Sequence, residues 1–408
     1  MRSTSTPDPP RSYAAGAELV ALLAMMTSLA AFSIDAMLPA LPQMARDLGI
    51  ARENDRQLII TILMLGMAAG QLVYGPISDS VGRKPAIYAG FAIFITGSLL
   101  CLLAGGFEAM LLGRFLQGLG AAGPRIVSMA MVRDLHEGRA MARLMSMVNS
   151  VFILVPVIAP TIGQGILLLA HWRVIFGVLL VQGVAALVWF ALRLDETLPL
   201  ERRAPFALRR IGRAFREAVR TRVAIGYTLS AAMVSGAFLG YLSSAQQVLQ
   251  EQYELGVLFP LSFSALALAI GIASVVNARL VMRLGMRRLA GTALAVLSSL
   301  SAGFLVVALA TGGHPPLWAL MGFLIATFFC LGILFGNFNA LAMEPLGHIA
   351  GVAAAVVGSV TSFLSLGLGT ALGQAYDGSV RPLVAGFAVL GMASAGFMVF
   401  AERGRPAA

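Results

Sequence analysis

The sequence is poor in charged side chains and in the residues that active sites most often use. Only 12% of its 408 residues are charged, it has two cysteines, and Lys84 is its single lysine. A phosphate-binding loop of the form G-x-x-x-x-G-K-[ST] requires a lysine, but the segment around Lys84 reads GRKP. The four histidines are scattered and offer no cluster for a metal or a catalytic base. The sequence therefore predicts neither an ATP-driven pump nor an enzyme, and no cofactor or metal.

Apolar residues take the place of the missing charges. They make up 58% of the chain, and the mean hydropathy is +0.85. Runs of about 20 apolar residues are too long and too uniform for barrel strands, so they predict membrane-spanning α-helices. Both cysteines fall inside such runs, which excludes a disulfide framework. Twelve spans are expected, near 17–39, 57–78, 86–105, 109–131, 143–168, 173–193, 223–245, 259–280, 289–311, 316–340, 349–374 and 381–401.

Basic residues gather on one side of these spans. A net charge of +10 would favour nucleic acid as the partner of a soluble protein, but here the arginines mark loops that stay in the cytoplasm. With a cytoplasmic N-terminus, the other side keeps only Arg46, Arg52, Arg56, Arg173 and Arg381. We therefore predict a multi-pass protein of the cell inner membrane, with both termini in the cytoplasm and no nucleic-acid partner.

The longest polar break divides the spans into six and six. We predict an N-terminal six-helix bundle over 1–193, a basic cytoplasmic linker over 194–222 and a C-terminal six-helix bundle over 223–408. Within the linker, apolar residues at 208, 211, 215 and 219 recur at helical spacing while the arginines face away. This pattern suits a short helix on the anionic inner leaflet, and it suits equally well a basic linker that only fixes topology.

A weak repeat relates the two halves. The stretch ARLVMRLGMRR, residues 278–288, resembles GPISDSVGRKP, residues 75–85, about 203 residues earlier. Each stretch follows the second span of its half, and Met282 stands where the first copy has Asp79. The chain therefore consists of two related bundles.

Two motifs resemble those of a known family. GPISDSVGRK, with Gly75, Asp79, Gly82, Arg83 and Lys84, resembles the loop 2–3 signature of the major facilitator superfamily. LLGRFLQGLGAAG, with Arg114, Gln117, Gly118 and Gly120, resembles its fourth-helix motif. The stretches SIDAMLPALP, PVIAPTIGQ, HWRVIF and NALAMEPLGHIAG are similar to the Bcr/CflA group of drug:proton antiporters, and the likeness covers nearly the whole chain. The resemblance implies an all-α polytopic fold of twelve transmembrane helices in two pseudo-symmetric six-helix bundles.

Asp35 is the carboxylate that lies deepest in a predicted span. It lies about five residues before the outer end of span 1, and Arg114 lies about five residues after the outer start of span 4, so the two share a similar depth. An ionised group in a span suggests a function and a partner. We expect Asp35 and Arg114 to form a proton-coupling pair, in which small movements of Arg114 change the protonation of Asp35. A fixed ion pair that locks the two spans together is the alternative.

Further polar and helix-breaking residues occur in spans 4 and 5. Arg125 lies three turns from Arg114 on almost the same face, where it either lines a cavity or extends to the inner headgroups. In span 5, Pro156 and Pro160 predict a bend, Gly163 and Gly165 predict close helix contact, and Asn149 precedes them. The resemblance implies that this helix prevents proton leak, and a bent packing helix is the alternative.

The resemblance also implies a gate and a substrate cavity. Asp79 would face the N-terminus of span 11 across the interface between the halves, and Arg83 would pair with Asp134 in loop 4–5, so that loop 2–3 holds the outward-open state. The cavity should lie between the halves near the midplane. Its candidate residues are Met37, Gln71, Asn149, Tyr241, Phe335 and Asn339.

These observations predict a transporter. We expect a monomeric, proton-coupled antiporter that exports small drug-like or toxic compounds by alternating access, with the substrate, protons and the lipid bilayer as its partners and without ATP. A cavity rich in apolar side chains suits lipophilic compounds better than sugars. A proton-coupled importer of a small metabolite, such as an amino acid or peptide, is the alternative, because the sequence does not fix the direction of transport.

Overall fold

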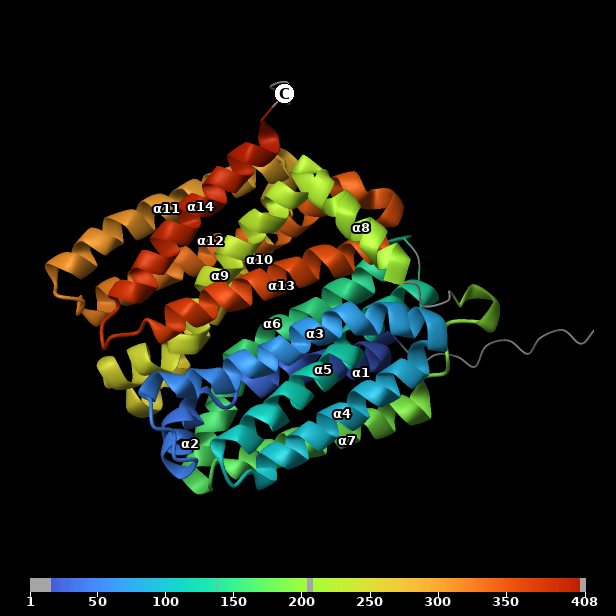
Figure 1. Ribbon diagram of the computed structural model, residues 1–408, viewed down its shortest axis with the longest axis horizontal. Coiled ribbons are helices and arrows are strands. Elements are labelled where there is room, and N and C mark those ends of the chain that lie inside the picture. Colours follow the sequence, from blue (N-terminus) through green and yellow to red (C-terminus); the bar gives the residue numbers. More distant parts are fainter. Residues whose placement is uncertain (1–15, 137, 204–207, 404–408) are drawn as a thin grey trace, which may run out of the picture.

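The computed structural model describes residues 16–136, 138–203 and 208–403, and within these ranges the chain is helical and contains no strand. Twelve of its helices have 20 residues or more (Figure 1). They are α1 (Gly16–Asp35), α3 (Leu58–Val81), α4 (Arg83–Leu103), α5 (Phe107–Leu135), α6 (Gly138–Leu169), α7 (Arg173–Arg193), α9 (Arg222–Gln246), α10 (Phe259–Leu284), α11 (Met286–Ala310), α12 (Leu317–Met343), α13 (Ala350–Gln374) and α14 (Arg381–Glu402). Every end agrees within five residues with the spans predicted from apolar runs, which confirms the all-α polytopic fold.

Length and composition alone would let nine segments of the described chain cross a membrane. One of the nine runs through both α12 and α13. Helix α5 is not among them, because it carries Arg114 and Arg125 inside its length and Glu108 and Arg133 near its ends. Helix α5 is therefore a span whose buried arginine needs polar partners inside the bundle.

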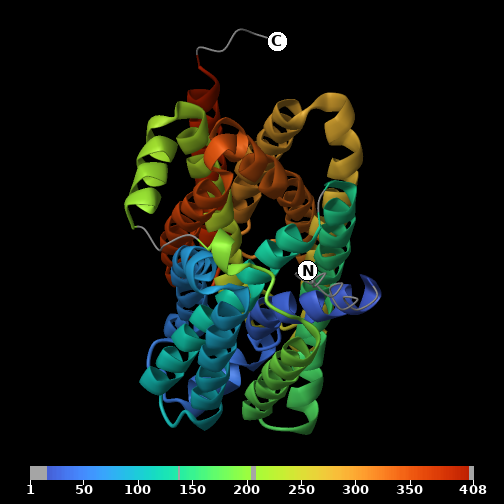
Figure 2. The ribbon, with the colours of Figure 1, turned by 90° about the vertical axis from the view of Figure 1, so that its right-hand side faces the viewer.

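The twelve helices form two bundles of six. Helices α1 and α3–α7 make the N-terminal bundle, and α9–α14 make the C-terminal bundle (Figure 2). The bundles meet along two seams, where α3 packs against α13 and α6 packs against α10 (Figure 1).

The two ends of the helix bundles carry different segments, the linker end and the far end. The linker end carries the α3–α4 turn at Gly82, the linker residues 194–203 and the linker helix α8 (Leu208–Arg220). The far end carries the short helices α2 (Leu41–Asp47), η2 (Glu53–Gln57) and η4 (Gln247–Gln252) (Figure 1). Helix α8 confirms the helical pattern read from the linker sequence.

Small residues let α5 lie very close to its neighbours. A Cβ at Gly118 would overlap the carbonyl oxygen of Leu63 in α3, and one at Gly120 would overlap the backbone nitrogen of Phe94 in α4. Helices approach this closely in a membrane only where side chains are small. The two glycines of the fourth-helix motif therefore make α3, α4 and α5 one tightly packed unit.

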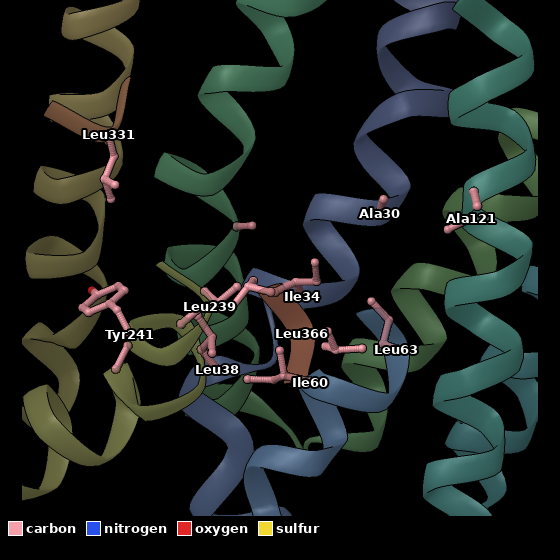
Figure 3. Close-up of a cluster of buried hydrophobic side chains, with 14 of the residues drawn as sticks. Ala30, Ile34, Leu38, Ile60, Leu63, Ala121, Leu239, Tyr241, Leu331 and Leu366 are labelled. Atoms are coloured by element: carbon pink, nitrogen blue, oxygen red, sulfur yellow. The ribbon is translucent and has the colours of Figure 1, made fainter. Parts of the chain in front are cut away.

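Apolar side chains fill the space between the bundles toward the far end. Ile34 of α1, Leu38 of η1 (Leu38–Ala40), Ile60 of α3, Leu239 of α9 and Leu366 of α13 converge there, and each is less than a tenth exposed (Figure 3). These residues come from both bundles. They form an apolar layer between the far end and the middle of the protein.

Candidate functional site

Asp35 lies where the first span breaks. Helix α1 ends at this residue, and the chain continues through a turn into η1 and α2. Pro39 and Pro42 explain the break, because a proline cannot donate the backbone hydrogen bond that would continue the helix. The predicted continuous span over 17–39 is therefore wrong beyond Asp35. The side chain of Asp35 is buried, with 5% of the residue exposed.

Helix α6 holds the break from one side. A Cβ at Gly163 would overlap the carbonyl oxygen of Ala36, so the helix backbone touches the residue next to Asp35. This contact confirms the close packing predicted for Gly163, whereas the same prediction is wrong for Gly165, which has open space around it. Helix α6 continues through Pro156 and Pro160, and the hydroxyl of Ser264 in α10 donates to the carbonyl of Val157 at 2.5 Å. The side chain of Asn149, placed in the same motif, lies outside those that the structure describes.

Arg114 does not pair with Asp35, contrary to the prediction. Its guanidinium is fully buried and donates to the carbonyl oxygens of Ile59 at 2.9 Å and Ser33 at 3.0 Å and to the Gln117 amide oxygen at 2.6 Å. Among the described residues, no basic side chain forms an ion pair with Asp35. Asp35 and Arg114 lie at a similar depth in the membrane spans, but this was not sufficient to predict that they pair. The rotation of each helix about its own axis decides which way its side chains point.

The carbonyls in the last turn of a helix lack partners within the helix, and a cation near them is stabilising. Ser33 lies in the last turn of α1, so Arg114 caps the helix that ends at Asp35. Gln117 extends the network by donating to the Ser98 hydroxyl of α4 at 2.9 Å. Arg114 thus holds the break of α1 through the Ser33 carbonyl, and it does not form the pair with Asp35 that was expected of it. Arg125, farther along α5, is exposed next to Ile126, which lines the cavity described below.

The loop 2–3 motif forms a charged cluster at the linker end. Arg83 bonds the carboxylate of Asp134 at 2.8 Å, that of Asp79 at 2.5 Å and the Ser78 hydroxyl at 3.0 Å. The predicted pair of Arg83 with Asp134 is confirmed. Asp79 pairs with Arg83 within its own bundle, so in this conformation it does not bond the N-terminus of α13 as predicted. Gly75 leaves open space around it, and the amine of Lys84 reaches the carbonyl of Ala191 at 3.4 Å.

Glu196, which the sequence analysis did not single out, caps the start of α4. Its carboxylate accepts the backbone N–H groups of Arg83 at 2.9 Å and Lys84 at 3.0 Å. Partial burial acts to raise the pKa of Glu196, but the amides of Leu198, Arg83 and Lys84 and the guanidinium of Arg203 outweigh it and hold the pKa below its ordinary value.

Gly82 makes this cap possible. Gly82 has φ of +109°, a conformation that favours glycine, and a Cβ there would lie 2.5 Å from the Glu196 carboxylate. An acid directly after the sixth span, inside a basic linker, was the available sequence signal for Glu196.

The C-terminal bundle has a related ionic cluster at the corresponding turn. Gly285 has φ of +78°, and Arg287 pairs with Glu344 and, at 3.0 Å, with Glu402. Glu402 ends the last helix of its bundle as Glu196 follows the last helix of the first, and the hydroxyl of Tyr227 donates to it at 2.7 Å. The weak sequence repeat therefore corresponds to a repeated ionic cluster, and Glu344 belongs to it.

A cavity of about 750 Å³ opens between the bundles at the linker end. Its walls come from α3, α5 and α6 on one side and from α8, η6 (Glu344–Ile349) and the start of α13 on the other. Asp79 and Arg83 line it opposite Ala350, the first residue of α13. The two groups that were predicted to form a latch thus face one cavity.

The candidate cavity residues have different positions. Gln71 lies in the cavity wall and accepts a hydrogen bond from Ser362 of α13 at 3.2 Å. Met37 and Tyr241 are fully buried and do not line this cavity, and the ring of Phe335 packs against that of Phe238, with centroids 5.6 Å apart. Asn339 is exposed. In this conformation only Gln71 of the described candidates lies in the cavity wall.

The far end is closed by hydrogen bonds between the bundles. Arg56 of η2 donates to both carboxylate oxygens of Glu251 in η4, at 2.6 and 2.5 Å. Asn54 donates to the backbone carbonyls of Gln374 at 3.0 Å and Tyr376 at 2.9 Å. We call this set, together with Gln57 and Gln247, the far-end network. Gln57 bonds Gln247 and, at 2.9 Å, the carbonyl of Gly373, while Gln247 donates to Asn54 at 2.8 Å.

The far-end network was not predicted from the sequence. Its residues lie in short segments between the long helices, where polar side chains are ordinary, and nothing in their spacing indicates contact between residues 195 positions apart. The protein is therefore closed at the far end and open to a cavity at the linker end.

Comparison with known proteins places this geometry in context. The sequence profile of the Major Facilitator Superfamily matches residues 23–370. The bicyclomycin resistance protein homolog of Haemophilus influenzae is 32% identical over 347 residues, covering 83% of this chain and 84% of that protein. The multidrug resistance protein MdtL of Escherichia coli O81 is 39% identical over 166 residues, or 41% and 42% of the two chains.

A solved structure supports the fold. The xylose transporter XylE of E. coli, in a partially occluded inward open conformation, superposes with a TM-score of 0.73 over 95% of this chain and 98% of that one, at 12% identity. At this identity the likeness concerns the fold alone.

Proposed function

This chain belongs to the Major Facilitator Superfamily, and on that premise we propose that it is a proton-coupled antiporter that exports small drug-like or toxic compounds across the inner membrane. It is a transporter and not an enzyme, and relatives named for bicyclomycin and multidrug resistance support drug efflux. The resemblance to the Bcr/CflA group, read from the sequence motifs, agrees with these relatives.

The observation that carries the proposal is the buried Asp35 at the break of α1. Ionising a carboxyl in an apolar site costs free energy unless water or a cation offsets it. In a site of this kind, the arrival of substrate or water can change whether the carboxyl is protonated or ionised. Asp35 would exchange a proton for substrate, while Arg114 and Gly163 hold the broken helix in place around it.

Alternating access supplies the rest of the mechanism. The transporting units would be residues 1–193 and 223–408, joined by the linker over 194–222. With the linker end in the cytoplasm, as the arginines favour, the cavity receives substrate from inside while the far-end network is closed. Rocking the bundles would then break the far-end network and bring Asp79 toward the start of α13, whose helix dipole favours an anion.

Uptake into inverted membrane vesicles tests the proposal. The vesicles would be made acidic inside, and uptake of ethidium and chloramphenicol would be followed with and without the pH gradient. We expect gradient-driven uptake with the natural chain. Asp35→Asn should remove the gradient-driven part, because the amide cannot release a proton.

Asp195→Asn is the matched control, since Asp195 is an exposed carboxylate in the linker. Its uptake should match that of the natural chain. Gradient-driven uptake that survives in Asp35→Asn would refute the coupling role. Movement of substrate in the same direction as protons would instead support an importer.

A further inference from the structure

The linker helix α8 has its rotation fixed by contacts with the C-terminal bundle. The Glu217 carboxylate lies 2.7 Å from the Nε2 atom of His348 in η6, and the neighbouring Ala218 is buried, with 5% exposed. The helix packs against α13 and α9 at the edge of the bundle (Figure 2). Residues 217 and 218 therefore define the side of α8 that faces the protein.

The outward side of α8 carries two stripes. Phe215 and Val219 are one turn apart and remain 49% and 43% exposed. Arg216 and Arg220, also one turn apart, are exposed on the adjacent strip of the helix. Among the described residues, neither arginine has an acidic partner within ion-pairing distance. The outward side thus presents apolar and cationic groups next to each other.

We propose that this side of α8 binds the anionic phospholipid surface of the membrane in which the twelve helices lie. The exposure of Phe215 and Val219 matches that of side chains on the outside of the long helices, such as Val188 at 50%. With 13 residues, α8 is about 20 Å long and too short to span about 30 Å of hydrocarbon. An amphipathic helix with an arginine stripe is suited to lie in the interface, with its apolar stripe among acyl chains and its guanidinium groups on phosphates.

Lipid fits these stripes better than a soluble anion. Free phosphate would satisfy the arginines but would leave the apolar stripe in water. Glu217 and Arg213, which lies two turns before Arg220 on nearly the same face, line the cavity, so the arginine stripe of α8 borders the cavity side. Lipid binding would therefore anchor one wall of the cavity to the membrane, a role that does not depend on proton coupling or on the substrate.

A fluorescent label on α8 tests this in the reconstituted full chain. Phe215→Cys would be labelled with the environment-sensitive dye NBD, since Cys101 and Cys330 are buried and resist labelling. The protein would be placed in vesicles of phosphatidylcholine alone or with 30% phosphatidylglycerol. We expect blue-shifted emission and quenching by lipid-attached nitroxide in the anionic vesicles. Each arginine near an anionic surface contributes roughly fivefold, so Arg216→Gln with Arg220→Gln should lower the ratio of bound to unbound α8 roughly 25-fold.

The control carries the same charge change elsewhere at the linker end. Arg279→Gln with Arg283→Gln, both exposed on α10, should leave the label on α8 in the lipid. Quenching by aqueous iodide in every vesicle would overturn the proposal. A blue shift without quenching by the lipid-attached nitroxide would also overturn it, because it would show that the stripe packs against protein.

Discussion

Glu251→Gln should open the far end of the transporter. The guanidinium of Arg56 is 6% exposed, its Nε atom has no hydrogen-bond partner, and Glu251 supplies both acceptors of its other two nitrogens. Glutamine has the same shape but offers one oxygen and no charge. The substitution therefore removes one charge-assisted hydrogen bond and leaves a nearly buried cation without its counter-ion.

The size of the effect follows from these contacts. A hydrogen bond to a charged group contributes about 1.5–3 kcal/mol, and the 40% exposure of the Glu251 side chain reduces this to about 1–2 kcal/mol through solvent screening. The ratio of closed to open far ends should fall roughly 5- to 30-fold. A population of 1% open would become roughly 5–25%.

Spin labels can measure this population. Arg52 in the N-terminal bundle and Val257 in the C-terminal bundle are exposed at the far end. Spin labels attached to Arg52→Cys and Val257→Cys would report the distance between the bundles by pulsed electron–electron double resonance. We expect a longer-distance population to grow in Glu251→Gln. Glu53→Gln, an exposed carboxylate in the same short helix as Arg56, should leave the distances unchanged. Identical distance distributions for Glu251→Gln and the natural chain would refute the reasoning.

Two further predictions concern single contacts. Glu196→Gln should lower stability at pH 7 by about 1–2 kcal/mol, seen as a lower Tm in detergent, because the cap of α4 loses its charge. The folded pKa of Glu196 lies below its ordinary value, so this contribution is present above about pH 4.3 and is lost as the pH falls through the folded pKa. The Tm values of the natural chain and of Glu196→Gln should therefore converge in acid. A difference in Tm that stays constant with pH would contradict this role of Glu196. Gly163→Ala should reduce vesicle uptake roughly 10-fold or more, because the added Cβ would overlap the Ala36 carbonyl. Gly165→Ala is the control and should not reduce uptake, because Gly165 has open space around it. Equal uptake by the two variants would contradict the packing role of Gly163.

Helix positions could be predicted closely from the sequence. Apolar runs set the ends of α7 at residues 173 and 193 and those of α9 within one residue, because lipid leaves few alternatives to a helix. The Arg83–Asp134 pair was also predictable, since the two residues belong to neighbouring loops at one end of the bundle.

Side-chain partners within and between the helices were harder to predict. Asp35 and Arg114 have similar depth, but Arg114 turns to the Ser33 carbonyl because α1 ends there and exposes it. The prolines at 39 and 42 were visible in the sequence and could have located the end of α1. The contact of Arg56 with Glu251 depends on how the two bundles tilt, which no local pattern encodes.

The two ends of the protein differ in how they would respond to their surroundings. Apart from the Arg56–Glu251 ion pair, the far-end network consists of the neutral amides of Asn54, Gln57 and Gln247, which neither titrate nor depend strongly on salt. The clusters around Arg83 and Arg287 at the linker end are ionic and are weakened by salt. With the linker end in the cytoplasm, acid or salt outside the cell would act on the far end chiefly through the Arg56–Glu251 pair, and most of the salt-sensitive contacts would lie where the cell keeps its ionic composition constant.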